Sequence, residues 1–317
     1  MPAKEQISLL EQELLNTANK TLLVGPHCDD IELFCGRLIM ERKGKREYEP
    51  NIHALITAAG PVKPLITRLA VYAFNRAIGS SKIRIAESRT AMEQLGVMDG
   101  NVSFLPFPQM ALHQFPQCVD EILNAIKNVN PDYIVMPTYE GGHVDHDTTN
   151  FFTWMAASSL GISSNRIIEY AAYRFNPSNN GLVVQQFIPI NGFDSLDFDV
   201  KPELKLKWQE IMKIFRSQRN TRAKITWESQ KESYRFYPGY DYRNFSFPVG
   251  GLKTRQRLGW LPFNLAPLFL DRSEKTPYDN PKYWLTLTPT DVLEAYAKAE
   301  RFHRRHLQVS DYIQRSA

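Results

Sequence analysis

The chain has 317 residues, of which 43% are hydrophobic, a length and composition typical of one large α/β domain or of one domain with an extension. Its formal net charge of +4 is not concentrated in one block, so the charge is compatible with an acidic substrate or a membrane surface and does not indicate nucleic-acid binding. Three cysteines argue against a disulfide scaffold, and neither a signal peptide nor an apolar run of roughly 20 residues is visible, so we expect a cytoplasmic protein without a transmembrane segment.

Strand-like and helix-like segments alternate along the first 175 residues. Short apolar runs predict strands at 21–25, 52–57, 102–107, 133–138 and 167–175. Amphipathic stretches predict a helix that follows the polar turn 26–30 and runs to about residue 43, and further helices at 84–95, 115–129 and 147–160. Strands that are separated by helices of this length predict a mostly parallel sheet covered on both faces.

Beyond residue 175 the pattern is looser. We expect a strand at 183–188, a helix at 205–218 and a final helix at about 289–307, with an irregular but folded segment at 238–283. We therefore divide the chain into a domain at 1–240 and a C-terminal extension at 241–317 that packs on the core.

Two polar turns follow predicted strands. PHCDDIE, at 26–32, comes directly after the first strand, and GGHVDHD, at 141–147, comes directly after the fourth. Ligands of open α/β sheets bind at the carboxyl ends of the strands. The two turns are therefore predicted to face one crevice from the same side.

The residue types in these turns are those of a catalytic metal site. Catalytic zinc takes three protein ligands, mostly His with Asp or Glu, and keeps one position for water. His27, Asp30 and one of His143 and His146 make such a set. Asp29 could then take a proton from the water as general base, while the other histidine stabilises an oxyanion or protonates the leaving amine.

Simpler interpretations of the same residues stay open. Asp30 and Glu32 are also what the first turn of a helix favours, and a His-x-x-His in a loop often binds no metal. Asp145 or Asp147 could orient an imidazole through its other nitrogen. A second His-x-x-His, at 303–306, encloses two arginines and is interpreted as a solvated basic helix end.

The ordered motifs resemble those of the LmbE-like, or PIG-L-type, N-deacetylase family. PHCDDIELFCG is similar to the family's His-x-Asp-Asp motif, and HVDH is similar to its second, His-x-x-His motif. The segment 84–96 resembles the family's Arg-x-x-Glu helix ending in Leu-Gly, and the segments 130–137 and 213–218 are also similar. The resemblance covers roughly residues 20–235.

This resemblance implies a Rossmann-like three-layer α/β sandwich with a mostly parallel sheet, a single zinc ion, and hydrolysis of N-acetyl groups on glucosamine-containing substrates. It assigns His27, Asp30 and His146 as the zinc ligands.

The other site residues are implied by the same resemblance. Asp29 would be the general base. His143 would stabilise the oxyanion or act as the acid, held by Asp145. Arg84 would reach the substrate, with Glu87 beside it as a structural partner.

Three positions depart from the family's pattern. Cys28 stands where members often have proline, and we interpret it as a buried spectator rather than a metal ligand. Pro61 follows Gly60 where many members carry Gly-Glu, and Gln109 stands where members often carry Asp. The last two changes leave the metal ligands untouched but lie in loops that would shape the sugar pocket, so the substrate stays open.

The predicted function is a zinc-dependent hydrolase that removes an N-acetyl or other N-acyl group from an amino sugar or its conjugate. Metal-bound water would attack the amide carbonyl, with Asp29 as general base. Two alternatives remain: a deacylase of formyl or longer acyl amides, and a catalytically inactive sugar-binding protein on the same fold. We expect one Zn²⁺ per chain, or another divalent metal in its place, and a small amino-sugar substrate, and leave homo-oligomerisation open.

Overall fold

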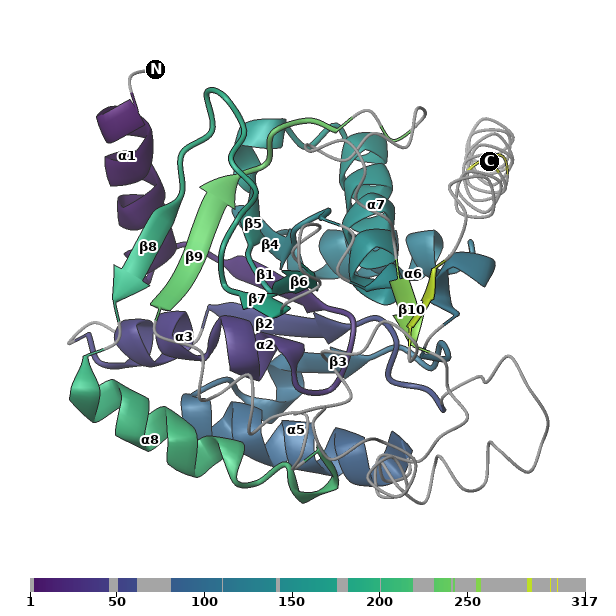
Figure 1. Cartoon of the computed structure of the whole chain (residues 1–317), viewed down its shortest axis with the longest axis horizontal. Coiled ribbons are helices and arrows are strands. Elements are labelled where there is room, and N and C mark those ends of the chain that lie inside the picture. Colours follow the sequence, from purple (N-terminus) through teal and green to yellow (C-terminus); the bar gives the residue numbers. More distant parts are fainter. Residues whose placement is uncertain are drawn as a thin grey trace, which may run out of the picture.

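The fold is described from a computed structural model of the whole chain (Figure 1). The structure describes residues 3–45, 51–61, 81–109, 111–140, 143–175, 182–199, 201–218, 231–240 and 242, the short segments 255–257 and 284–286, and residues 297 and 301.

A seven-stranded sheet with the order β3-β2-β1-β4-β5-β9-β8 lies at the centre of the described residues (Figure 1). Its strands are β1 Thr21–Gly25, β2 Ile52–Ile56, β3 Val102–Phe104, β4 Tyr133–Pro137, β5 Ile167–Tyr170, β8 Leu196–Asp199 and β9 Lys231–Phe236. The strands from β3 to β5 pair in parallel, whereas β9 pairs antiparallel with both β5 and β8. The predicted, mostly parallel sheet is confirmed.

Helices cover both faces of this sheet. The helices in the described part of the chain are α1 Ala3–Leu15, α2 Asp30–Phe34, α3 Gly36–Lys43, α5 Ser81–Leu95, α6 Cys118–Val129, α7 Val144–Ser159 and α8 Pro202–Met212. One hydrophobic cluster packs α1, α2, α3, α5 and α8 against one face, and a second cluster packs α6 and α7 against the other. Figure 1 shows α5 and α8 below the sheet and α6 and α7 on the opposite side. The predicted three-layer sandwich is confirmed.

The apolar run of β1 explains its central position. Leu23 belongs to the cluster on the α5 side, whereas Leu22 and Val24 belong to the cluster on the α6 side. Side chains alternate between the two faces of a strand, so a strand with several consecutive apolar residues must be covered on both faces. The same run ends at Gly25, where the polar turn of the first motif begins.

Some elements differ from the sequence-based expectation. The strand predicted at 167–175 is two strands, because the chain leaves the central sheet after Tyr170 and forms a hairpin of β6 Tyr173–Phe175 with β7 Leu182–Val184. The helix predicted from residue 147 already begins at Val144, so most of the HVDH motif lies in its first turn. The helix predicted at 205–218 is α8, which ends at Met212 and is followed by a 3₁₀ turn, Arg216–Gln218.

Strand β9 was not predicted, because its sequence KESYRF carries several charged residues and yet is buried. Glu232 and Arg235 are buried in the sheet, and each is held by polar partners. Burial of charge is tolerated only with such partners. The hydrophobic pattern therefore misses this strand.

The C-terminal part lies largely outside the described residues, including the helix predicted at about 289–307 and the His-x-x-His at 303–306. Its described elements are β10 Arg255–Arg257 and β11 Trp284–Thr286, which pair antiparallel. Within the described residues, no helix is long and apolar enough to cross a membrane. The boundary at about residue 240 stays a prediction.

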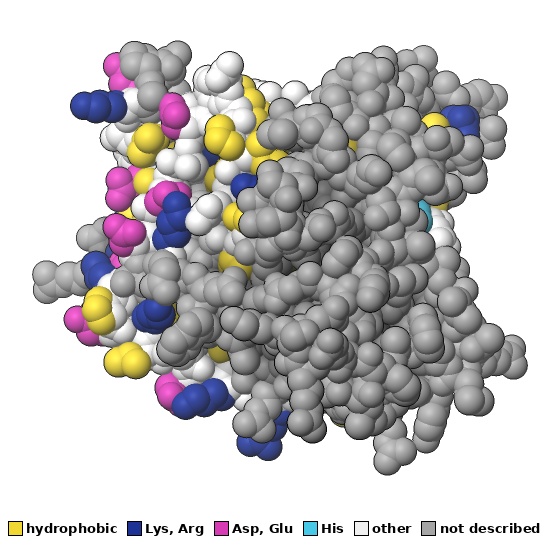
Figure 2. Space-filling view, in the orientation of Figure 1, with side chains coloured by type: hydrophobic (Ala, Val, Ile, Leu, Met, Phe, Trp, Pro, Cys, Tyr) yellow, Lys and Arg dark blue, Asp and Glu magenta, His cyan; other side chains and the backbone are white. Residues whose placement is uncertain are grey.

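Figure 2 shows basic and acidic side chains interspersed on the side of this face where α1 and α8 lie, without a single-sign cluster among the described residues.

Candidate metal and catalytic site

The two polar turns meet at one edge of the sheet. β1 and β4 are adjacent and parallel, so the turns that follow them lie side by side. The first turn supplies His27 and Asp29, and α2 begins at Asp30. The second supplies His143 and leads into α7, whose first turn contains His146. The two turns, which were predicted to face each other because each follows a strand of a parallel sheet, therefore lie together in the structure.

His27, Asp30 and His146 form a compact, buried cluster. One ligand atom from each lies within 4.8 Å of the others. Oδ2 of Asp30 is 3.0 Å from Nδ1 of His27, and its Oδ1 is 3.4 Å from Nε2 of His146. That Nε2 atom is buried and has no hydrogen-bond partner among the described residues. Two imidazoles and a carboxylate around an unsatisfied nitrogen fit a divalent metal ion.

The electrostatics of the cluster favour a cation. Burial would raise the pKa of Asp30, but the facing His146 and His27 outweigh it and hold this pKa well below its usual range. Burial would lower the pKa of His27, but the carboxylates of Asp30 and Asp145 raise it to about 10. In the metal-free protein a proton on His27 thus balances the carboxylates. A metal ion at this cluster would take the place of that proton, and metal binding would release the proton to solvent.

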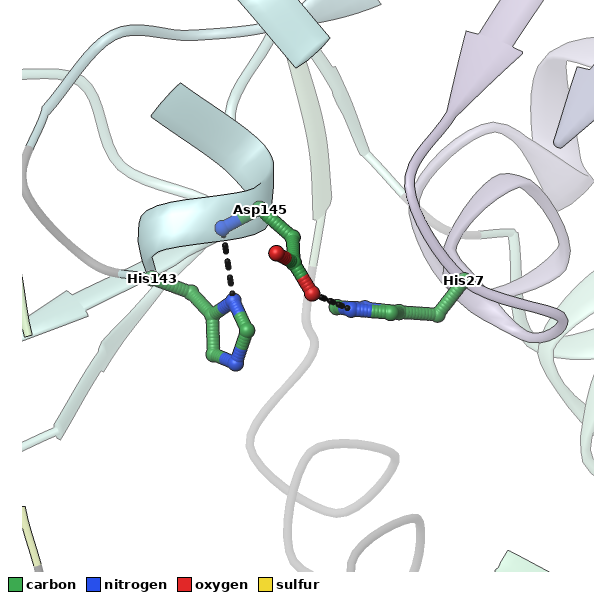
Figure 3. A group of neighbouring side chains, drawn as sticks. All are labelled: His27, His143 and Asp145. Atoms are coloured by element: carbon green, nitrogen blue, oxygen red, sulfur yellow. Dashed lines mark hydrogen bonds and ion pairs between the residues drawn. The ribbon is translucent and has the colours of Figure 1, made fainter. Parts of the chain in front are cut away.

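Asp145 contacts the site in two ways, both drawn in Figure 3. Its carboxylate, which is fully buried, accepts a hydrogen bond from Nε2 of His27 at 3.0 Å. Its backbone N–H donates to Nδ1 of His143 at 3.1 Å. The carboxylate also accepts from the backbone N–H of Leu112 at 3.2 Å. When His27 is neutral and donates its Nε2–H to Asp145, the lone pair on Nδ1 faces Asp30.

His143 is the N-cap residue of α7, and Nδ1 is the atom that caps the helix. A neutral imidazole that accepts at Nδ1 carries its proton on Nε2. Burial lowers the pKa of His143 to about 3, so the ring is neutral at physiological pH. A second geometric set, His27, His143 and Asp145, also meets the distance criterion for a metal. In that set, however, Nδ1 of His143 is already engaged and Nε2 is a donor.

Asp29 and Arg84 lie next to the cluster. Nη2 of Arg84 is 3.5 Å from Oδ1 of Asp29, and both side chains are buried. Burial raises the pKa of Asp29, and the positive charge of Arg84 opposes that rise. Glu87, expected beside Arg84, has its carboxylate on the backbone N–H and the hydroxyl of Ser217.

Two glutamines complete the surroundings of Arg84. Gln109 Oε1 accepts a hydrogen bond from Nη1 of Arg84. Gln218, when its amide oxygen is turned toward the arginine, accepts from Nε and Nη2. Gln109 was singled out in the sequence only as a departure from the family pattern. Gln218 was not predicted as a site residue, although it ends the 213–218 segment that carries part of the resemblance.

Tyr173 is another site neighbour that the sequence did not indicate. Its ring packs edge-on against His146, with 5.0 Å between the ring centroids. The residue lies on β6, in the hairpin that was predicted as a continuation of β5. Cys28, by contrast, belongs to neither candidate metal set, and burial raises the pKa of its thiol to about 12.

Comparison with known families identifies the segment that contains both motifs. Residues 22–157 match the PIG-L family. The family is described as GlcNAc-PI de-N-acetylase. The resemblance predicted from the motifs is thereby confirmed over this segment. The matched PIG-L segment runs from β1 into α7, so it contains every predicted site residue. The resemblance was expected to extend to about residue 235, but the matched segment ends at residue 157.

Solved structures with the same fold include deacetylases. A deacetylase of teicoplanin biosynthesis, solved as a complex, is 16% identical, covers 70% of this chain and 99% of its own, and has a TM-score of 0.50. A triple mutant of a deacetylase of the teicoplanin pathway is 17% identical, covers 68% of this chain and 97% of its own, and has a TM-score of 0.51. Because the sequence identities are this low, the similarity to these structures shows a shared fold and nothing further. No curated protein matches the chain significantly.

Proposed function

We propose that the protein is a zinc-dependent amidohydrolase that removes an N-acetyl or other N-acyl group from an amino sugar or its conjugate. The observation that carries the proposal is the buried His27, Asp30 and His146 cluster, in which Nε2 of His146 has no hydrogen-bond partner among the described residues. The match of residues 22–157 to the GlcNAc-PI de-N-acetylase family supports the substrate class.

In this proposal His27, Asp30 and His146 hold the metal. His27 binds through Nδ1, because its Nε2–H is donated to Asp145. His146 rather than His143 is the third ligand, because Nδ1 of His143 caps α7 and its Nε2 carries the proton. A zinc ion held there would polarise the amide carbonyl and lower the pKa of its bound water to about 7.

Asp29 is the proposed general base. Its carboxylate neighbours the ligand Asp30 along the chain and faces Arg84 at 3.5 Å, so it is held at the edge of the cluster. Asp29 takes a proton from the attacking water as the oxygen–carbon bond forms. It returns that proton to the amide nitrogen as the carbon–nitrogen bond breaks, which releases a carboxylic acid and an amine. The acid then passes its remaining proton to the amine or to solvent.

His143 is the proposed oxyanion donor. The Nε2–H of its neutral ring is the proposed donor, and the N-cap bond from the backbone N–H of Asp145 to Nδ1 fixes the ring. Donors that are held in place before the reaction stabilise a developing oxyanion most effectively, because they need no reorganisation. Of the two roles left open by the sequence, this arrangement favours oxyanion stabilisation over proton donation. The pKa of His143 is lowered to about 3, so the ring is neutral and has no imidazolium proton to donate.

The decisive experiment measures acyl release by the purified chain with its metal content known. Acetate or amine release from N-acetylglucosamine conjugates should stop on chelation and return on addition of zinc. Asp29→Ala should lose at least about a hundredfold in kcat, within the range typical of a lost general base. Asp99→Ala, which removes an exposed carboxylate, is the matched control.

Two results would redirect the proposal. Release from formyl or longer acyl amides alone would change the acyl group. Stoichiometric zinc with glycan binding but no hydrolysis of any amide in the panel would identify a sugar-binding protein instead.

A further inference from the structure

Asn150 lies one helical turn after His146 on α7. Residues four apart in an α-helix share a face, so Asn150 lies on the face of α7 that carries the proposed ligand. Its Nδ2 donates to the backbone carbonyl of Pro137, the last residue of β4, at 2.7 Å and to Oε1 of Glu169 on β5 at 2.8 Å. Both Asn150 and Glu169 are fully buried. One amide therefore ties α7 to two neighbouring strands of the sheet.

Glu169, which accepts from this amide, is itself held in a buried ion pair. Its Oε2 accepts from Nε of Arg235 on β9 at 2.9 Å and from the hydroxyl of Tyr240 at 2.8 Å. Nη2 of Arg235 also donates at 3.0 Å to the hydroxyl of Thr138, which lies between β4 and His143. Buried polar networks whose members are satisfied make a structure rigid. The acceptor for the amide is therefore held in one place.

Tyr242 sets the orientation of the same amide. Its hydroxyl donates to Oδ1 of Asn150, which leaves Nδ2 as the end of the amide that faces the two strands. Tyr242 is buried, and its ring lies against Phe151 and Trp154 of α7, with 4.9 and 5.0 Å between the ring centroids. The residue falls just inside the segment that the sequence assigned to the C-terminal extension. That segment thus contributes a group to this network.

The candidate metal cluster depends on where α7 lies, because its members come from two separate turns. Asp30 belongs to the turn after β1, and its Oδ1 lies 3.4 Å from Nε2 of His146 on α7. A zinc–nitrogen bond is about 2.0–2.1 Å long, so a small rotation of the helix would take His146 out of reach of a shared ion.

We propose that Asn150 is a positioning residue of the metal site: held by Glu169 and Tyr242, its amide fixes α7 and so places His146 opposite the ligands from the first turn. This inference rests on the proposed function, in which His146 is a zinc ligand. Asn150 acts through His146 and takes no part in the chemical steps.

The zinc affinity of the full chain, measured by competition with a chromophoric chelator, tests this role without a substrate. Asn150→Ala removes the amide and should weaken zinc binding about tenfold, as expected for the loss of a group that orients a ligand. Tyr242→Phe removes only the hydroxyl and keeps the ring packing, so it gives an answer even where Asn150→Ala does not fold. It should weaken zinc binding several-fold. Tyr133→Phe, which loses a hydroxyl at the other end of β4, is the matched control and should bind zinc as the unmodified chain does.

A general loss of stability is separated by Leu14→Ala. Leu14 lies on α1 in the core cluster on the other face of the sheet. Its truncation should lower the urea midpoint of unfolding and leave the dissociation constant for zinc unchanged. In acetate release by the zinc-loaded chain, Asn150→Ala should lower kcat about tenfold with KM unchanged, because a misplaced metal affects the transition state more than ground-state binding. Unchanged zinc affinity in both Asn150→Ala and Tyr242→Phe would overturn the proposal, as would an equal loss of affinity in Leu14→Ala.

The positioning role and the proposed function fail separately. Zinc bound with full affinity by His146→Gln would refute the proposed metal site. Zinc lost by His146→Gln but bound normally by Asn150→Ala and Tyr242→Phe would refute the positioning role and leave the proposed function standing.

Discussion

Nε2 of His27 lies 3.0 Å from Oδ2 of Asp145, although the two residues are 118 positions apart in the chain (Figure 3). This contact joins the turn after β1 to the first turn of α7. In a neutral His27 ring it also decides which nitrogen would face the candidate metal, because the proton on Nε2 leaves the lone pair on Nδ1. One carboxylate thereby orients a proposed ligand, while the backbone N–H of the same residue orients His143.

Asp145→Asn should weaken metal binding without abolishing it. The amide keeps the size of the side chain but loses the negative charge that makes His27 a better ligand. Loss of such an outer carboxylate typically costs about 10- to 100-fold in metal affinity. Competition with a chromophoric chelator measures the dissociation constant for zinc. Asp99→Asn, an exposed position, is the control, and an unchanged dissociation constant for Asp145→Asn would contradict the orienting role.

His146→Gln and His143→Gln should have different effects. The first removes a proposed ligand, so the purified variant should lose zinc. The second removes the proposed oxyanion donor, so it should keep its zinc and lose about 10²- to 10³-fold in kcat, the cost measured for one such donor elsewhere. Elemental analysis and acetate release give the two readouts. Zinc loss in His143→Gln with zinc retained in His146→Gln would favour the other geometric set, His27, His143 and Asp145.

Glu140 should make stability depend on pH. Burial raises its pKa from the usual 4.5 to about 7, against the opposing charges of Arg235 and Arg174. The folded state therefore holds this proton more tightly than the unfolded state does. The resulting stability is fully present below pH 4.5 and is lost as the pH rises through about 7.

Glu140→Gln removes this titration. Relative to the unmodified chain, the variant should gain about 3 kcal/mol in free energy of unfolding between pH 4.5 and pH 8, at roughly 1.4 kcal/mol per unit of pKa shift. Urea unfolding across this range measures the difference. Glu121→Gln, on the exposed face of α6, should show no such trend. A difference that stays constant with pH would show that Glu140 is ionised in both states.

Glu232→Ala should destabilise the fold, because it removes the hydrogen bonds that join β9 to the start of α3. The carboxylate of Glu232 on β9 accepts hydrogen bonds from the backbone N–H groups of Arg37 and Leu38, at 2.8 and 3.0 Å, in the first turn of α3. Its removal leaves buried donors without a partner, so we expect a loss of about 3 kcal/mol in the free energy of unfolding. Chemical denaturation measures the loss. Glu93→Ala, exposed on α5, should change stability by less than about 0.5 kcal/mol.

The helix and strand alternation of the first 170 residues could be predicted because each element carries its own signal. β1 is apolar at its three central positions, Leu22 to Val24, and α6 has a clear apolar stripe. The C-cap of α6 is Asn130, which adopts a left-handed conformation with φ of 48°. The two motif turns were predictable for the same reason, since they follow such strands. β9 was not predictable, because Glu232 and Arg235 look solvent-exposed until their partners Arg37 and Glu169 are known.

The sequence by itself determined the α/β layout and the residue types that converge at the ends of β1 and β4, because periodicity and turn composition are local properties. The residue types alone left His143 and His146 as alternative ligands, and the tertiary structure shows a physical difference between them: Nδ1 of His143 caps α7, whereas Nε2 of His146 faces Asp30. The placement of Gln218 against Arg84 likewise came from packing. Hydrogen bonds between segments more than a hundred residues apart have no local pattern, so they are decided only when the chain folds.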